Sequence, residues 1–342
     1  MSRKQVVLKI AGALLGIILI GILIYKTDVN SIAKQLGMIG SFFPLVILVT
    51  FTSQFIAVFA WYLSFFPSIS PSALFHLFNI RLIGESFAQV NPTNVIAGET
   101  LKGILLKDKL GVDYLQGAAS LLLSRIMIIL SSGALLIVGA AFLFQRLAFD
   151  GLKTASVIIC ILILAAIFGF IYALKMKKGV FAPAAFVIRK LFGRFEKMSI
   201  VADAVSKLDS ELIKFYHQKR NAFYLVFSLS VLHRVVGSME YYIIFWALDI
   251  NAGFISCILF DLSSMLFRSA GFFVPAQLGF EEFGNKLMCS LTNVPGEETW
   301  ITVSLVRRGR QIFWILAGFV VYVFLSSGVK KELKKVNVNE EK

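Results

Sequence analysis

The sequence RLIGESFAQVNPTNVIAGETLKGILL, residues 81–106, decides the fold, because it places charges, amides and a proline between two long apolar segments. Each of its apolar arms is too short to span a bilayer, since a spanning helix needs about 20 apolar residues. Its middle, residues 89–99, lacks helical periodicity, and Pro92 removes a backbone donor there. Non-helical backbone persists at membrane depth only inside protein or beside a water-filled cavity. The stretch therefore predicts a re-entrant helical hairpin whose broken tip lies at residues 91–98.

The chain as a whole has the composition of a polytopic membrane protein. Of its 342 residues, 58% are hydrophobic, and several apolar runs are long enough to cross a bilayer. The run at residues 5–24 follows basic residues as a signal peptide does, but no small-x-small cleavage site ends it, so we expect an uncleaved first span. Five more spans are expected, at residues 39–66, 114–144, 154–174, 222–248 and 299–326. The predicted fold class is an all-α polytopic membrane protein: a single integral membrane domain with six full transmembrane helices and two re-entrant helical hairpins.

The formal net charge of +14 is concentrated in residues 175–220 and in a basic tail, residues 329–342. Loops beside the anionic cytoplasmic leaflet have this pattern, so we expect no nucleic-acid partner. We expect a multi-pass protein of the cell (inner or plasma) membrane with the N-terminus, the C-terminus and residues 175–220 in the cytoplasm. Two apolar stripes at helical spacing, one from Phe181 and one from Val201, predict basic amphipathic helices lying in the membrane interface. Residues 25–37 are expected to form a polar loop.

A second interrupted apolar region covers residues 254–289 and is broken at GFFVPAQLGFEEFG, residues 271–284. Adding 183 to a position in the first half reaches similar chemistry here. The matched side chains are Pro92 with Pro275, Asn94 with Gln277, Glu99 with Glu282, and Arg125 with Arg308. Because the two units, residues 39–145 and 222–328, would start on opposite sides of the membrane, they form an inverted repeat of the kind found in secondary transporters. The alternative is a chance alignment of apolar segments.

Proline and glycine mark the places where the two hairpins are expected to break. Proline cannot donate a backbone hydrogen bond, and glycine tolerates tight turns. The expected breaks are Pro92 and Gly98 in the first hairpin and Pro275 and Gly279 in the second.

Charged residues inside the predicted spans need partners, because each costs about 2.5–3.5 kcal/mol at the bilayer centre on insertion scales. They must therefore face one another, the hairpins or a wet cavity. Glu99 is the expected partner of Arg125, and Glu282 that of Arg308. The remaining intramembrane polar residues of this kind are His233, Arg234, Glu240, Arg307 and Arg310.

These charges have two possible uses. They either lock the hairpins through internal ion pairs, or they line a cavity whose guanidinium groups bind a phosphate, which suits the planar fork of arginine. Arg307 and Arg310 are expected to serve structure or to snorkel to the interface. The candidate substrate-binding residues are Arg125, Arg308, Glu99, Glu282, Asn94, Gln277, Arg81, Glu85 and Arg268.

Sequence motifs for catalysis are missing. The three histidines have no mutual spacing that suggests a metal site, and there is no P-loop, dinucleotide fingerprint or nucleophile elbow. The three cysteines lie singly in apolar stretches, where we expect small buried side chains. We expect no catalytic residue, no metal, no cofactor, and no ATP hydrolysis by this chain.

The segment GESFAQVNPTNVIAGETLKGILLKDKLGV, followed by SLLLSRIMI in the next span, resembles the first signature of the flippase-like membrane family. This family is the transmembrane region of lysylphosphatidylglycerol synthases and includes the hopanoid-associated membrane proteins. Its second signature, a P-x-x-x-G turn with glutamate, is matched by Pro275, Gly279, Glu281 and Glu282. The resemblance extends from Val6 to about residue 327, with Gln277 as a departure from the asparagine of the first half.

The resemblance implies movement of a lipid, or of a lipid-linked molecule, between the leaflets of a bacterial inner membrane. The expected substrate is an anionic phospholipid or lipid-linked phosphate. The aminoacyl-transferase domain of the synthases is not expected here, because only a basic tail follows the last span. Two alternatives stay open. The protein is a lipid-modifying enzyme with Glu99 or Glu282 as base, or a membrane subunit or scaffold for a separate synthase or glycosyltransferase (lysyltransferase-type or other) without transport of its own.

Overall fold

The computed structural model describes residues 29–90, 95–144, 150–183, 186–187, 190, 196–271, 274, 277, 279–295 and 298–340, and these form helices and connections with no strand. Five helices are long and apolar enough to cross a membrane within this part of the chain. They are α3 (Phe43–Leu63), α6 (Tyr114–Phe144), α7 (Asp150–Lys175), α10 (Arg220–Ala247) and α13 (Thr299–Glu340). The all-α fold class is thereby confirmed; the predicted first span, residues 5–24, lies outside the described residues.

Two helical hairpins accompany these spans. The first is α4 (Ala73–Val90) with α5 (Val95–Leu110), and the second is α11 (Phe254–Ala270) with α12 (Phe280–Thr292). In each pair the two helices pack on each other, so both interrupted apolar regions are helix–break–helix units. Whether they enter the bilayer and return on the same side stays a prediction.

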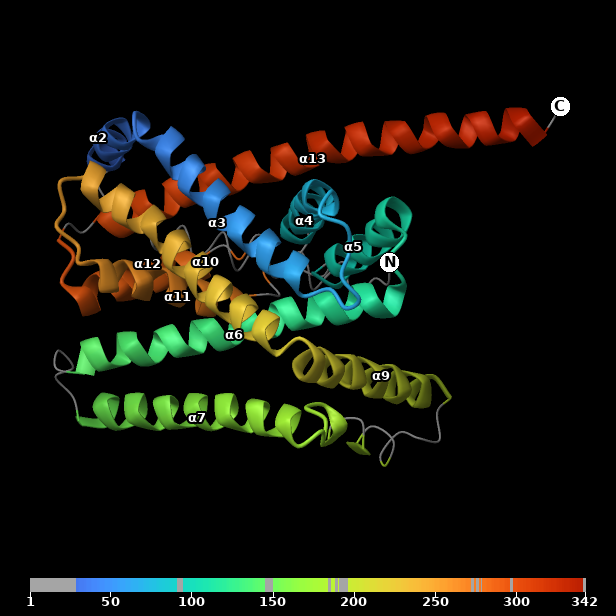
Figure 1. The fold of residues 1–342 in the computed structure, drawn as a ribbon. Coiled ribbons are helices and arrows are strands. Elements are labelled where there is room, and N and C mark those ends of the chain that lie inside the picture. The colour runs from blue at the N-terminus through green and yellow to red at the C-terminus, as the bar shows by residue number, and fades with distance from the viewer. Residues whose placement is uncertain are drawn as a thin grey trace.

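The two hairpins occupy equivalent places in two units of the same helix order (Figure 1). Helices α3, α4, α5 and α6 recur as α10, α11, α12 and α13, and a shift of 183 residues superimposes their ranges closely. Helices α3 and α10 cross each other in the middle of the molecule and run in opposite directions. Helices α6 and α13 also run in opposite directions. The α4–α5 hairpin therefore lies toward one end of the molecule and the α11–α12 hairpin toward the other. The long apolar helices between them fix this opposed arrangement.

Glycine acts differently in the two hairpins. Gly279 precedes α12 with a φ of +84°, a left-handed conformation that favours glycine, and its N–H donates to the Glu282 carboxylate at 2.8 Å. The predicted break at Gly98 is wrong, because Gly98 lies inside α5. A Cβ there would stand 2.6 Å from the carbonyl oxygen of Gly84 on α4, so Gly98 permits close packing of the two arms. Pro92 and Pro275 lie outside the described residues.

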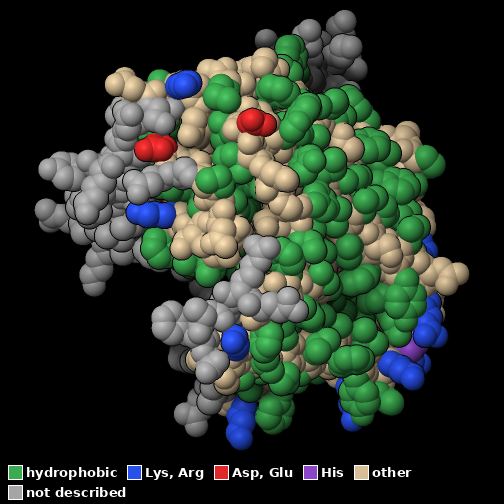
Figure 2. Space-filling view, turned by 90° about the vertical axis from the view of Figure 1, so that its left-hand side faces the viewer, with side chains coloured by type: hydrophobic (Ala, Val, Ile, Leu, Met, Phe, Trp, Pro, Cys, Tyr) green, Lys and Arg blue, Asp and Glu red, His purple; other side chains and the backbone are tan. Residues whose placement is uncertain are grey.

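Apolar side chains form a separate core around each hairpin. One cluster joins α10, α11, α12 and α13, and another joins α3, α4, α5 and α13. Many other hydrophobic side chains are exposed on the outer helix faces, and they cover much of the surface seen from the end where α2 (Val29–Gly40) lies (Figure 2). Such an exterior fits a lipid environment and is typical of a multi-pass membrane protein.

The ends of several elements differ from the sequence-based expectation. The polar loop expected at residues 25–37 contains α2, an amphipathic helix. It buries Ile32 and Ile39 against the apolar core around the α11–α12 hairpin. Span two accordingly begins at Phe43, with Pro44 in its first turn, where a missing backbone donor costs nothing. Sequence reasoning took α2 for a loop because its polar residues are prominent, and it started span two four residues early.

The amphipathic stripe beginning at Val201 is one face of α9 (Glu196–Gln218). Its C-terminal half packs on protein, since Leu212 and Phe215 are buried in a cluster with residues of α6, α7 and α10. Asp209 on α9 accepts hydrogen bonds from the N–H groups of Val180 and Phe181, at 2.7 and 3.0 Å, and so fastens α9 to the chain after α7. Most of the other stripe lies outside the described residues, and a position in the membrane interface stays a prediction for both.

Candidate functional site

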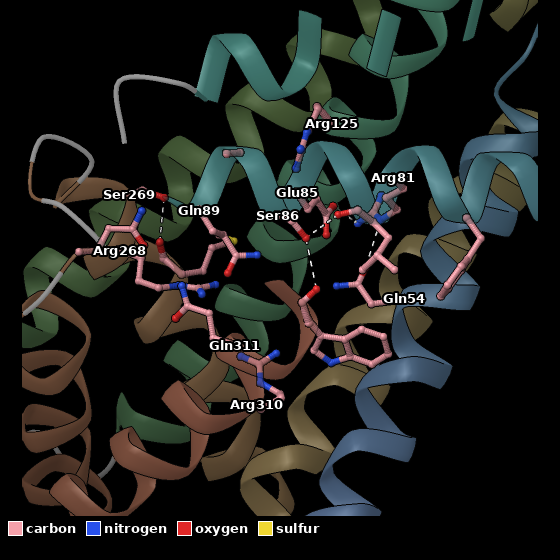
Figure 3. A pocket seen from close by; sticks show the side chains of 16 residues that line it. Gln54, Arg81, Glu85, Ser86, Gln89, Arg125, Arg268, Ser269, Arg310 and Gln311 are labelled. Atoms are coloured by element: carbon pink, nitrogen blue, oxygen red, sulfur yellow. Dashed lines mark hydrogen bonds and ion pairs between the residues drawn. The ribbon is translucent and has the colours of Figure 1, made fainter. Parts of the chain in front are cut away.

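A cavity of about 500 Å³ lies where the two units meet, and helices of both contribute to it (Figure 3). Its walls come from α3, α4 and α6 of the first unit and from α11, α13 and the break before α12 of the second. Four arginines and one glutamate line it, together with amide, hydroxyl and apolar side chains. The lining residues are Gln54, Phe78, Arg81, Leu82, Glu85, Ser86, Ala88, Gln89, Arg125, Met265, Arg268, Ser269, Gln277, Arg310, Gln311 and Trp314.

Helix α4 supplies most of the first wall. Arg81 and Glu85, one helical turn apart, form an ion pair at 3.0 Å, and Arg81 Nε donates to Gln54 Oε1 on α3 at 3.0 Å. Ser86 Oγ, on the next position of α4, donates to the carbonyl oxygen of Trp314 on α13 at 3.2 Å. Residues four and five positions after Arg81 lie on the same side of α4, so these polar side chains face the cavity and the opposite unit.

Arg125 reaches the cavity from α6 as part of a three-residue charge group. Glu99 on α5 pairs with Lys102, 3.0 Å away on the same helix, and with Arg125 at 2.5 Å. Lys102 is buried, but 47% of the Arg125 side chain and 31% of the Glu99 side chain are exposed. The Glu99 carboxylate is therefore shared by two cations. The exposed part of the Arg125 side chain is accessible to a ligand.

Arg268 enters the cavity from α11, on a different side from Arg125 (Figure 3). Within the described part of the chain, no carboxylate lies within ion-pair distance of its guanidinium. It is thus the one cavity arginine that lacks an acidic partner among these residues. Gln277, also on the cavity wall, has a φ of +51° in the break between α11 and α12.

A closed ionic network lies behind the second wall. Arg307 on α13 pairs with Glu240 on α10 at 2.8 Å and with Glu281 on α12 at 2.7 Å, and all three side chains are no more than 3% exposed. Its third nitrogen donates to Ser264 on α11 at 3.1 Å. Arg310 takes the other oxygen of Glu240 at 2.8 Å and borders the cavity. The network joins four helices of the second unit and places each arginine beside a glutamate.

The structure brings together most of the predicted site residues. The expected pairs are confirmed: Arg125 with Glu99, and Arg308 with Glu282 at 3.1 Å. Five predicted residues line the cavity, namely Arg81, Glu85, Arg125, Arg268 and Gln277. Asn94 lies outside the described residues.

The cavity lining includes Arg310 but not Arg308, which differs from the expectation. Arg308 is not among the lining residues; it donates to Glu282 and, at 3.5 Å, to the carbonyl oxygen of Gln277 from behind the wall. Arg310 pairs with the buried Glu240, as expected of a structural residue, and it also borders the cavity, which was not expected. The expectation that Arg307 is structural agrees with its buried ion pairs. The role of Arg308 as a ligand-binding residue stays a prediction.

Several lining residues were missed by sequence reasoning. Gln54 is the one amide in the apolar helix α3, and Gln311 directly follows the arginines of α13; both are signals that could have been used, because a buried amide needs a partner. Trp314 gives no such signal, since tryptophan is common in membrane helices. No group of three or more histidine, cysteine or acidic side chains that could hold a metal occurs in the described ranges.

The fold and the cavity together define a multi-pass membrane protein in which two opposed helical hairpins surround an arginine-rich pocket. Residues 7–318 match the family described as the lysylphosphatidylglycerol synthase TM region, so the chain belongs to this family. Comparison with curated proteins gave no match, and comparison with solved structures gave none either. The family agrees with the resemblance carried by the two hairpin segments.

Proposed function

We propose that this protein moves an anionic lipid, or a lipid-linked phosphate, between the two leaflets of the membrane. The observation that carries the proposal is the cavity of about 500 Å³ between the two units, with Arg81, Arg125, Arg268 and Arg310 in its walls. Guanidinium groups bind phosphate oxygens through two parallel hydrogen bonds, so this lining suits a phosphate head group. The lipid tails would stay in the bilayer.

The lining also has features that suit the rest of a lipid head group. Four glutamine side chains and two serines offer hydrogen bonds to glycerol or sugar hydroxyls, while Phe78, Leu82 and Trp314 offer apolar contact. Hairpins that point in opposite directions could open the site to one leaflet and then to the other, as inverted units do in secondary transporters. The exposed fraction of Arg125 leaves this group free for such a ligand.

Reconstitution into liposomes tests the proposal. Vesicles would contain a fluorescent anionic phospholipid or a zwitterionic one, and a membrane-impermeant reductant would report the fraction of label in the outer leaflet over time. We expect the protein to accelerate exchange of the anionic lipid, and Arg125→Gln to lose most of this acceleration. Arg220→Gln is the matched control, because Arg220 is exposed at the start of α10, outside the cavity.

Two results would count against transport. The first is exchange at the protein-free rate for wild type and both variants, when the protein is folded and inserted. The second is the same negative result together with co-purification of a lipid-modifying enzyme at fixed stoichiometry, which would favour the scaffold role.

A further inference from the structure

The charges around the cavity do not cancel. Among the residues that the structure describes, eight cations and six carboxylates pair with one another or line the cavity, which leaves an excess of two positive charges. We call these fourteen groups the central charged cluster. Its cations are Arg81, Lys102, Arg125, Arg234, Arg268, Arg307, Arg308 and Arg310, and its acids are Glu85, Glu99, Glu240, Asp261, Glu281 and Glu282. Charges sheltered from water are paired in folded proteins, because an unpaired one is expensive.

The two excess charges can be assigned to places. Three ion pairs are neutral, Arg81–Glu85, Arg234–Asp261 and Arg308–Glu282, and so is the network of Arg307 and Arg310 with Glu240 and Glu281. What is left is the group in which Lys102 and Arg125 share Glu99, and Arg268 with no acid. Both sources of excess charge border the cavity, through Arg125 and Arg268.

We infer that the cavity binds a group with at least two negative charges, a phosphate monoester or a diphosphate at the end of a lipid, held between Arg125 and Arg268. This inference rests on the proposed function and specifies its substrate. A phosphodiester carries one negative charge and would leave one arginine uncompensated. A phosphate monoester carries about −1.5 to −2 charges near neutral pH and has three terminal oxygens, enough for two guanidinium forks.

The positions of these two arginines fit a bridging role. Arg125 comes from α6 in the first unit and Arg268 from α11 in the second, so one ligand between them joins both units. The residue equivalent to Arg268 under the 183-residue shift is Glu85, which neutralises Arg81. A carboxylate thus satisfies the first unit at this position, whereas the second unit presents a free cation.

Direct binding measurements test the inference with the purified full chain in detergent. Tryptophan fluorescence serves as the signal, because Trp314 lines the cavity, and Trp314→Phe shows which part of the signal is local. The probes are dihexanoyl phosphatidic acid, farnesyl diphosphate, dihexanoyl phosphatidylglycerol and inorganic phosphate. We expect the first two to bind about tenfold or more tightly than the phosphodiester, since a charge-assisted hydrogen bond contributes about 1.5–3 kcal/mol.

Variants and pH sharpen the same test. Arg268→Gln should remove most of the preference for the monoester, Arg268→Lys should keep part of it, and Arg220→Gln should leave it unchanged. Because the second pKa of a phosphate monoester is about 6, its binding should tighten between pH 5 and pH 7.5, while binding of the phosphodiester should change little. Thermal unfolding of each variant in the same detergent shows that the protein is folded.

The outcomes separate this inference from the proposed function. Equal affinity for the phosphodiester and the monoester, at both pH values, overturns the inference even if lipid exchange in liposomes is rapid. Preference for the monoester without any lipid exchange supports the inference and removes the transport function. Inorganic phosphate bound as tightly as dihexanoyl phosphatidic acid would assign the site to free phosphate and overturn the lipid substrate.

Discussion

The two hairpins use charge in opposite ways. In the α11–α12 hairpin, Glu281 is buried and receives Arg307, which in turn holds Glu240 on α10. In the α4–α5 hairpin, Glu99 is partly exposed and shared by a lysine and an arginine. The second hairpin is tied to α10 and α13 by a buried network of ion pairs, whereas the first hairpin borders the cavity and carries an excess of positive charge.

This difference indicates that the charges of the second hairpin mainly stabilise the fold, whereas those of the first hairpin are available to a ligand. A buried network of ion pairs is costly to break, because removal of one partner leaves another charge unpaired. An exposed and shared ion pair costs little to rearrange. We therefore expect substitutions in the Arg307 network to act mainly on folding and substitution of Arg125 to act mainly on the ligand.

The largest effect on stability is expected for Arg307→Gln. The substitution leaves Glu281 without its ion-pair partner and Glu240 with Arg310 alone, at a cost of about 3–5 kcal/mol. The measurement is the midpoint of thermal unfolding in detergent, followed by size-exclusion chromatography. A decrease of the unfolding midpoint no larger than that of Arg220→Gln would show that the Arg307 network does not stabilise the fold. Partial recovery of the midpoint on adding Glu281→Gln would support the ion pair between the two residues.

A smaller effect is expected for Gly98→Ala, which tests how closely the arms of the first hairpin pack. The new Cβ would lie 2.6 Å from the Gly84 carbonyl oxygen and 2.8 Å from the Ala88 Cβ, so one arm must shift, at about 1–3 kcal/mol. Gly103→Ala is the matched control in the same helix, since nothing lies within 4 Å of its added Cβ. The control should be neutral or stabilise α5, because alanine is the better helix former. Equal midpoints of unfolding for the two variants would disprove the close packing.

Sequence reasoning predicted the local features of this fold well. Apolar length located the spans from α3 onward, and the breaks in apolar pattern located both hairpins. It also paired Arg125 with Glu99 and Arg308 with Glu282, because the same separation of 26 residues recurs in both units. These predictions depend on features within one unit.

Features that depend on the rotation of a helix or on how helices pack against one another were not predicted. Arg308 and Arg310 are two residues apart, so they point about 200° apart around α13, and hydropathy does not fix which of them faces the cavity. The approach of Gly98 to Gly84 and the contribution of Gln54 from α3 likewise exist only once the helices are packed.

The smallest effect on stability is expected for Arg125→Gln, although its effect on lipid exchange is expected to be severe. Glu99 keeps Lys102 at 3.0 Å when Arg125 is removed, so no carboxylate is left unpaired, and loss of an exposed pair costs about 0–1 kcal/mol. Unfolding midpoints of Arg125→Gln and Arg307→Gln, measured side by side, make the contrast quantitative. If Arg125→Gln destabilised the protein as strongly as Arg307→Gln, the charges of the first hairpin would be as structural as those of the second. The main argument that Arg125 binds a ligand in the cavity would then fail.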